Sequence, residues 1–464
     1  MRLLLSVSLL ACIGCAASAT ADHGDAPAKE SAPPADLGTR KSGVDWPRFL
    51  GPSGDSVSTE KGIISPWPAK GLRLVWERSL GTGYSMPTIS RGRAFIFDRV
   101  RNRARLVACK SETGEELWKF EYPTDYVDQY GYNNGPRCCP VVDGERVYVF
   151  GPEGMLHCVR VADGTLVWKV DTRAKFNVIQ NFFGVASTPV IEGNLLLVQV
   201  GGSPPGSDEV PVMDLKGNGS GLVAFDKYDG SIRYQVTDEL ASYAGPVVTT
   251  IDGRRWCFLF SRSGLLGLDP ATGKLDFRFP WRAPILESVN ASNPVVVGNR
   301  VLISETYGPG SALLKVKPGG YETVWTDAEK GRNKSLQCHW NTPIHVDGYV
   351  YGSSGRHSNN AELRCVELDT GKVMWSVPGL TRSSLLLVDG HFICLSEDGS
   401  LRLLKVDPKQ YVEVSVLSPG DLSGKDRAPL LEAPCWAAPI LSHGLLYVRG
   451  KDRLACLELI PESK

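Results

Sequence analysis

Residues Ala108–Trp118, with the sequence ACKSETGEELW, contain the pattern that decides the fold. A small or apolar residue begins it, Gly occupies the seventh position and an aromatic residue ends it at the eleventh. Close copies follow at Cys158–Trp168, Ala224–Tyr234, Gly267–Phe277 and Cys365–Trp375, with a looser copy at Leu314–Trp325. The copies lie about 50 residues apart, a period typical of propeller blades. Such a period indicates one structural unit used many times, with the core formed between neighbouring units.

Each copy is preceded by the pattern of a β-hairpin. In residues 140–150 a Pro leads into alternating apolar residues, with Asp143-Gly144 as the turn, and Asp347-Gly348 marks the same turn in a later copy. Gly accepts the positive φ that these tight turns require. The repeated phrase then supplies two more strands, so that each unit forms one four-stranded antiparallel blade. We expect the closing aromatic residues to fill the gaps between blades, most clearly Trp118, Trp168, Trp325 and Trp375.

Eight leading segments are present, beginning near Pro87, Pro140, Pro189, Pro246, Pro294, Pro343, Ser384 and Pro439. The seventh lacks the Pro and a clean closing phrase, and the eighth has only three strands. A matching fourth strand lies at the other end of the chain, in residues 71–76. The sequence therefore predicts an all-β fold over residues 46–464, an eight-bladed propeller closed where Leu72–Trp76 pairs with the strand around Leu454–Leu459. Closure by the N-terminal strand would leave no open sheet edge.

The N-terminus has the features of an export signal. Arg2 is followed by an apolar run and then by small residues, so we predict a signal peptide over residues 1–15. Cys15 or Cys12 would be the lipidated residue of a lipoprotein, with Cys15 leaving the more usual signal length, whereas residues 17–19 would serve an ordinary signal peptidase. Residues 16–45 are rich in Ala and Pro and are predicted to be a disordered tether. The expected location is the periplasm or the outer envelope.

Composition excludes several classes of function. The 51 Lys and Arg balance 51 Asp and Glu, so the chain lacks the basic surface of a nucleic-acid-binding protein. Many of the 12 Cys occupy interior strand positions, where Cys acts as a small apolar residue. No stretch after the signal is long and apolar enough for a membrane span. We expect a monomer that meets the membrane only through a lipid anchor and whose partners are envelope proteins.

These repeats resemble the family of PQQ-like β-propeller proteins. The phrase at Ala108–Trp118 is similar to the tryptophan-docking motif of quinoprotein alcohol dehydrogenases. The opening residues 45–55 resemble the entry sequence of an exported bacterial subgroup. The resemblance covers about residues 45–460 and implies the fold. It leaves function open, because the family includes dehydrogenases that use pyrroloquinoline quinone (PQQ) and calcium, a non-catalytic lipoprotein that scaffolds outer-membrane protein insertion, and many members without an assigned activity.

The loops that enter the innermost strands of a propeller surround one mouth of its channel. Only ring closure brings these entries together, so we expect a shared ligand site there. Its predicted members are Arg137, Cys138, Cys139, Tyr243, Asn293, His339, Trp340 and Arg382. Two arginines with few carboxylates would favour an anionic or carbonyl-rich ligand. The alternative is a hydrated mouth, with any partner bound to outer loops such as 203–219.

The adjacent pair Cys138-Cys139 is open to two interpretations. The resemblance implies a disulfide between adjacent cysteines beside the cofactor, whereas the local sequence favours two small residues at the start of a buried strand. Calcium requires several oxygen ligands, and the entry segments contain no Asp or Glu at their centres. Glu287 with Asn290 could offer oxygens, although acidic surface turns are common. His339 is expected to be a hydrogen-bonded channel histidine rather than a metal ligand.

Two classes of function remain. The first is an exported propeller scaffold that binds a protein or a small ligand without turnover, with no catalytic residue and no metal site. The second is a PQQ-dependent oxidoreductase of alcohols or sugars that uses the channel mouth. The missing carboxylates favour the scaffold.

Overall fold

The computed structural model describes residues 33–179, 182–421 and 429–462. The predicted signal peptide, with Cys12 and Cys15, lies outside these residues. Thirty-three strands account for nearly all regular structure, beside the short helix α1 (Thr172–Phe176) and the 3-10 turn η1 (Ser207–Glu209). Among the described residues, no helix is long and apolar enough to cross a membrane.

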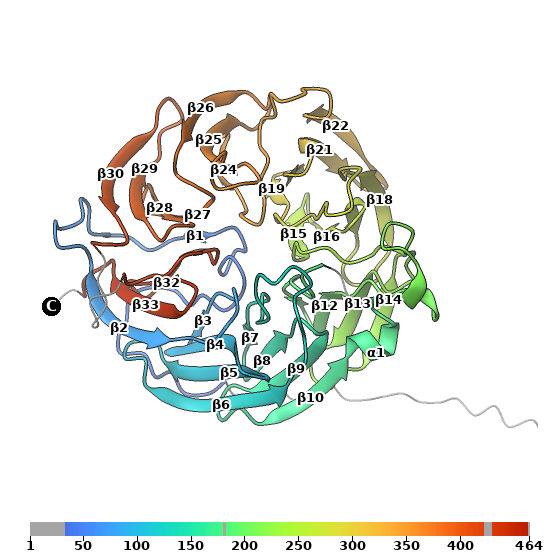
Figure 1. The fold of residues 1–464 in the computed structure, drawn as a ribbon, viewed down its shortest axis with the longest axis horizontal. Helices are drawn as coiled ribbons and strands as arrows, with labels where there is room; N and C mark the ends of the chain where they lie inside the picture. The colour runs from blue at the N-terminus through green and yellow to red at the C-terminus, as the bar shows by residue number, and fades with distance from the viewer. Residues whose placement is uncertain (1–32, 180–181, 422–428, 463–464) are drawn as a thin grey trace, which may run out of the picture. The chain divides into compact units, whose positions relative to one another are not determined.

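Eight sheets follow one another in a ring around a central axis, as predicted (Figure 1), and all are antiparallel except for one added parallel strand in the seventh. In the first seven blades the strands run in chain order from the channel to the rim. The first four blades are β3 (Thr88–Ser90), β4 (Arg93–Val100), β5 (Arg103–Lys110) and β6 (Glu116–Pro123); β7 (Val141–Asp143), β8 (Arg146–Phe150), β9 (Met155–Arg160) and β10 (Leu166–Asp171); β11 (Val190–Glu192), β12 (Leu195–Gln199), β13 (Leu222–Asp226) and β14 (Ile232–Val236); and β15 (Val247–Ile251), β16 (Arg254–Phe260), β17 (Gly264–Leu268) and β18 (Leu275–Pro280).

The remaining blades follow the same order, and the last takes its outer strand from the N-terminal part of the chain. They are β19 (Val295–Val297), β20 (Arg300–Glu305), β21 (Gly310–Lys317) and β22 (Gly320–Thr326); β23 (Ile344–Val346), β24 (Tyr349–Ser354), β25 (Glu362–Glu367) and β26 (Val373–Pro378); β27 (Ser383–Val388), β28 (His391–Ser396), β29 (Leu401–Lys405) and β30 (Val412–Leu417); and β31 (Ile440–Ser442), β32 (Leu445–Arg449), β33 (Arg453–Glu458) and β2 (Arg73–Ser79).

The aromatic residue that ends each phrase joins its blade to the next one. Trp168 Nε1 donates a hydrogen bond to the Lys227 carbonyl of the third blade, at 3.1 Å. The ring lies so close to Gly230 that a Cβ there would come within 2.8 Å of it. Trp76, Trp118, Trp325 and Trp375 make the same kind of indole-to-carbonyl bond across their junctions. The predicted inter-blade role is confirmed, although Trp118, Trp325 and Trp375 are only half-buried.

The ring closes by the predicted pairing. Strand β2 is antiparallel to β33, with Arg73 opposite Glu458 and Trp76 opposite Cys456. Trp76 also repeats the junction contact, because its Nε1 donates to the Ser111 carbonyl of the first blade at 2.8 Å. The eighth blade is therefore made from both ends of the propeller sequence.

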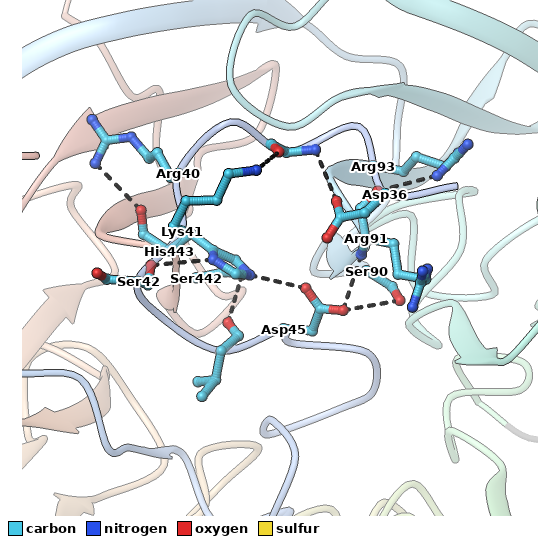
Figure 2. A network of polar contacts seen from close by, with 12 residues as sticks. Asp36, Arg40, Lys41, Ser42, Asp45, Ser90, Arg91, Arg93, Ser442 and His443 are labelled. Carbon is cyan, nitrogen blue, oxygen red and sulfur yellow. Dashed lines mark hydrogen bonds and ion pairs between the residues drawn. The ribbon is translucent and has the colours of Figure 1, made fainter. Parts of the chain in front are cut away.

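An N-terminal clasp, residues 34–45, holds the closed junction from outside the sheets. Figure 2 shows Asp45 between the first and eighth blades. Its carboxylate accepts hydrogen bonds from Ser90 and from the Arg91 amide, and contacts His443 Nε2 at 3.1 Å. Arg40 donates to the Ile460 carbonyl. The predicted disordered tether of residues 16–45 is therefore too long at its C-terminal end, since these contacts order the chain from residue 34 onward.

The segment after the clasp crosses the ends of the innermost strands. Trp46 and Ile89 exchange both backbone hydrogen bonds, and the Val142 amide donates to the Pro47 carbonyl. Strand β1 (Val57–Ser58) then runs parallel to β27, with Val57 opposite Leu387. These contacts lie at the C-terminal ends of the inner strands. The segment therefore bounds the channel opposite the entry loops, a role that the sequence pattern did not predict.

Deletion of residues 1–80 should lower the melting temperature sharply or cause aggregation, because it removes the clasp, β1 and the strand that covers the edge of β33. Thermal unfolding followed by circular dichroism measures the change. Deletion of residues 1–32 is the matched control and should leave the melting temperature unaltered. An equal melting temperature for both deletions would show that β2 does not close the ring.

Candidate functional site

A cavity of about 520 Å³ occupies the channel at the entry ends of the inner strands. This volume lies within the range of small-ligand pockets. Met86, Thr188 and Ser384 line its walls from three blades, while Phe49 and Leu50 contribute from the crossing N-terminal segment. The cavity is thus open toward the entry loops and bounded by that segment at its other end.

Six of the eight predicted site residues line this cavity: Arg137, Cys139, Tyr243, His339, Trp340 and Arg382. Cys138 points instead into the core cluster that contains Tyr148 and Trp168. Asn293 is also buried beneath the mouth, where its Oδ1 accepts a hydrogen bond from the Gly245 amide at 2.8 Å and links two blades. Cys138 and Cys139 precede β7 and face different surroundings, so only one member of the pair reaches the channel. Ligand binding by the other six remains a prediction.

Aromatic side chains form a continuous chain of contacts around much of the mouth. We call them the aromatic collar: Tyr84, Tyr130, Tyr132, Phe183, Tyr243, Tyr307, His339, Trp340 and Trp436. Trp340 and Trp436, from the sixth and eighth blade entries, have ring centroids 4.9 Å apart. Tyr132 connects Trp436 to Phe183, and Phe183 contacts Tyr243. These rings come from loops of different blades, so the mouth offers many flat apolar faces in a small space.

Arg382 is held over the rings of Trp340 and Trp436 by a carboxylate. Its guanidinium lies 4.4 Å from the ring centre of Trp340, and Nε donates to Glu397 Oε2 at 2.9 Å while Nη2 contacts the other oxygen. Trp436 Nε1 and Ser358 Oγ also donate to Glu397. Burial alone would raise the pKa of Glu397, yet these hydrogen bonds hold it below its ordinary value.

Arg137 is paired in the same way. Its Nη2 contacts the fully buried carboxylate oxygen of Asp128 and donates to the Asn133 carbonyl at 3.0 Å. Both predicted arginines are thus neutralised, by carboxylates that lie outside the entry segments. Asp128 and Glu397 therefore balance the charges of these two arginines, and the expectation of an anionic or carbonyl-rich ligand stays a prediction.

His339 is neutral and links the collar to Arg382. Burial, aided by the nearby arginines Arg382 and Arg356, lowers the pKa of His339 to about 3. Arg382 Nη1 approaches its Nδ1 at 3.5 Å, and Tyr307 Oη lies 3.0 Å from its Nε2. A guanidinium only donates, so we assign the hydrogen of His339 to Nε2 and the acceptor role to Tyr307. Its role as a hydrogen-bonded channel histidine agrees with the sequence expectation.

The cysteine pair has the properties of inert buried thiols. Cys138 and Cys139 are both free and buried. Burial raises the pKa of Cys139 to about 12 and that of Cys138 well above its ordinary value. A thiol in this state is a poor nucleophile, since the thiolate is the reactive form.

The residues at the mouth do not fit the calcium and PQQ site that the family resemblance implies. Calcium takes several oxygen ligands, including carboxylates. Glu287 is the single carboxylate of the lining, and Asp128 and Glu397 are bound to arginines. Asn290, the suggested companion of Glu287, is buried and does not belong to the cavity lining, and its side-chain Nδ2 donates to the Ser261 carbonyl. Within the described part of the chain, no group of three His, Cys, Asp or Glu side chains could hold a metal ion.

Several lining residues were missed because they lie outside the repeat. Tyr130 and Tyr132 belong to the loop between the first two blades, and Phe183 to the loop before the third blade. Tyr307 and Arg356 follow second strands rather than entering first ones. Exposed aromatic pairs in long loops were the available signal, because loops rarely carry bulky apolar residues without a binding or packing role.

A family model described as outer membrane protein assembly factor BamB matches residues 102–377, more than half of the chain. The chain belongs to this BamB-like propeller family. Among curated proteins, BamB of Alkalilimnicola ehrlichii is 23% identical over an alignment of 225 residues, and the match covers 39% of this chain. The match spans only 54%, about half, of that relative's length.

Solved structures with the same fold include both classes that the sequence left open. BamB from Moraxella catarrhalis aligns with a TM-score of 0.54 and 14% identity, covering 85% of this chain and 99% of that one. Quinohemoprotein alcohol dehydrogenase from Comamonas testosteroni aligns with a TM-score of 0.58 and 12% identity, covering 90% and 82%. At these identities the likeness concerns the fold alone.

Replacing Arg382 by Gln should lower the free energy of unfolding at pH 7 by on the order of 2 kcal/mol, between the values for exposed and fully buried pairs. The pKa of Glu397 is lowered in the fold, so its contribution is present above the ordinary pKa of about 4.3 and is lost as the pH falls. Urea titrations at pH 7 and pH 4 should therefore show a smaller difference in unfolding free energy between the wild type and Arg382→Gln at pH 4.

The double variant Arg382→Gln, Glu397→Gln is the matched control for this pair. It should regain part of the lost stability at pH 7, because no carboxylate is left half-buried without its partner. The same loss at both pH values, with no recovery in the double variant, would show that the pair does not hold the mouth together.

Proposed function

We propose that this chain is a non-catalytic scaffold of the cell envelope that binds a partner polypeptide at its aromatic collar. The observation that carries the proposal is the collar itself. Nine ring-bearing side chains from loops of several blades line one cavity of about 520 Å³. Aromatic residues are the side chains most enriched in the energetic centres of protein interfaces.

The charge arrangement supports binding rather than chemistry. Arg137 and Arg382 are engaged by carboxylates, His339 is neutral, and the Cys139 thiol is protonated at neutral pH. Side chains fixed in this way position rings and exclude water, whereas proton transfer needs a group whose pKa lies near the working pH. The names of the related proteins support an envelope setting, since the matching family model and the Alkalilimnicola ehrlichii relative are both described as outer membrane protein assembly factor BamB.

The surface around the collar supports a partner of protein size. Several exposed apolar side chains lie on the loops next to the mouth, among them Val127, Tyr130 and Tyr132 on one loop and Leu286 on another. An exposed apolar group beside a pocket is typical of an interaction site. A predicted signal peptide with lipidation at Cys15 or Cys12 would place this face beside envelope proteins.

Photo-crosslinking in cells tests the proposal. A photoreactive phenylalanine at Tyr132, whose side chain is 60% exposed at the mouth, should form adducts with envelope proteins. The matched control is the same residue at Val416, which is 43% exposed on the outer strand β30. Defined adducts at position 132 and none at position 416 are expected. Adducts confined to position 416, or equal adducts at both, would place the partner surface elsewhere.

A further inference from the structure

Three side-chain hydroxyl groups at the mouth can still donate a hydrogen bond to a ligand. Tyr243 accepts from the Phe183 amide at 2.9 Å, and Thr342 accepts from the Asn293 amide at 3.1 Å. Tyr307 accepts from His339 in the tautomer assigned above. Each hydroxyl keeps its own hydrogen, and among the described residues none of the three donates it to a protein acceptor. All three residues line the cavity.

Arg356 adds further donors. Its guanidinium lies 4.5 Å from the ring centre of Tyr307 and lines the cavity. In the described part of the chain its side-chain N–H groups have no hydrogen-bond or ion-pair partner. Unlike Arg137 and Arg382, it forms no ion pair with a carboxylate of the described residues, and its donors remain available to a ligand.

Carboxylate acceptors in the lining are scarce by comparison, and its remaining side-chain acceptors are hydroxyls, such as those of Ser56 and Ser384, and the ring of His357. Asn341 is committed, because its Oδ1 accepts from the His339 amide and its Nδ2 donates to the Ser353 carbonyl. Glu287 is the single carboxylate among the lining residues. A ligand that fits must therefore bring many acceptors and few donors, together with apolar surface for the rings.

We propose that the aromatic collar binds a proline-rich, extended segment of a partner polypeptide; this inference rests on the function proposed above. Proline carries a carbonyl but no N–H, so a run of prolines supplies acceptors without donors. Polyproline II leaves every carbonyl free of internal hydrogen bonds, and its rings stack in aromatic-lined grooves. An ordinary extended peptide would bring one N–H per residue into a lining that offers Glu287 alone as a free carboxylate.

An oligosaccharide is the main competing ligand class, because sugar rings also stack on aromatic side chains. Each sugar hydroxyl, however, brings a hydrogen that needs an acceptor, and the lining has a single carboxylate. The surplus of donors therefore favours the proline-rich segment. The exposed rings of Tyr130 and Tyr132, two residues apart on one loop, would form the first stacking surface at the rim.

Binding of capped decaproline to the purified chain tests the proposal, measured by calorimetry and by tryptophan fluorescence, to which Trp340 and Trp436 at the mouth contribute. A capped decapeptide of Ala, Gly and Ser should bind at least about tenfold more weakly, since it lacks rings to stack and adds N–H donors. Maltoheptaose serves as the sugar arm and should not bind.

Three variants locate the site. Tyr307→Phe removes one hydroxyl donor and should weaken decaproline binding by about threefold to tenfold. Tyr132→Ala removes an exposed ring and should weaken it by about tenfold. Tyr411→Phe, which removes a hydroxyl that bonds Glu413 outside the mouth, is the control and should not alter the affinity.

Equal binding of both peptides, no decaproline binding, binding of maltoheptaose alone, or unaltered affinity in Tyr307→Phe and Tyr132→Ala would each overturn the proposal. These outcomes are distinct from failure of the scaffold function. Crosslinks at position 132 in cells, without decaproline binding to the purified chain, would indicate a protein partner that is not proline-rich. Absence of those crosslinks would contradict the scaffold function.

Discussion

The contact of a flat aromatic ring with a glycine of the next blade is the constraint on which the rest of the structure depends. Five junctions share it, in the pairs Trp76–Gly114, Trp118–Gly164, Trp168–Gly230, Tyr234–Gly273 and Trp325–Gly371. In each pair a Cβ on the glycine would lie within about 3 Å of the ring. The glycines also have positive φ, so one residue type serves both the turn and the close approach. A larger residue would push the neighbouring sheets apart.

Ring closure then places loops from distant parts of the sequence around one mouth. The junction between the first and eighth blades has contacts beyond the one between ring and glycine, because β2 pairs with β33 and the clasp adds the Asp45–His443 contact. The hydrogen bond to Asp45 raises the pKa of His443. In a closed ring of this kind the entry loops can differ in sequence from one blade to the next. The collar is built on those loops, so function is separated from the repeat that makes the fold.

The fold could be predicted from the sequence because the glycine and the closing aromatic residue of each phrase have a physical role in the blade. The matching strand at 71–76 indicated how the ring closes. The mouth was predictable only in part. Entry positions identified six lining residues, but the partners of the two arginines lie elsewhere in the chain, with Asp128 nine and Glu397 fifteen residues away. Tertiary contacts, rather than local pattern, therefore set the charge of the mouth. Residues such as Tyr132 and Phe183 lie in loops whose course no repeat determines.

A double-mutant cycle on Trp168 and Gly230 tests the docking contact most directly. Gly230→Ala would place a methyl group 2.8 Å from the ring and would strain a φ of 75°. Its cost in unfolding free energy should be larger in the wild type than in Trp168→Ala, by about 1–3 kcal/mol. Gly193→Ala, with positive φ but no neighbour within 4 Å, should cost the same in both backgrounds. Equal costs for Gly230→Ala in the two backgrounds would contradict the account.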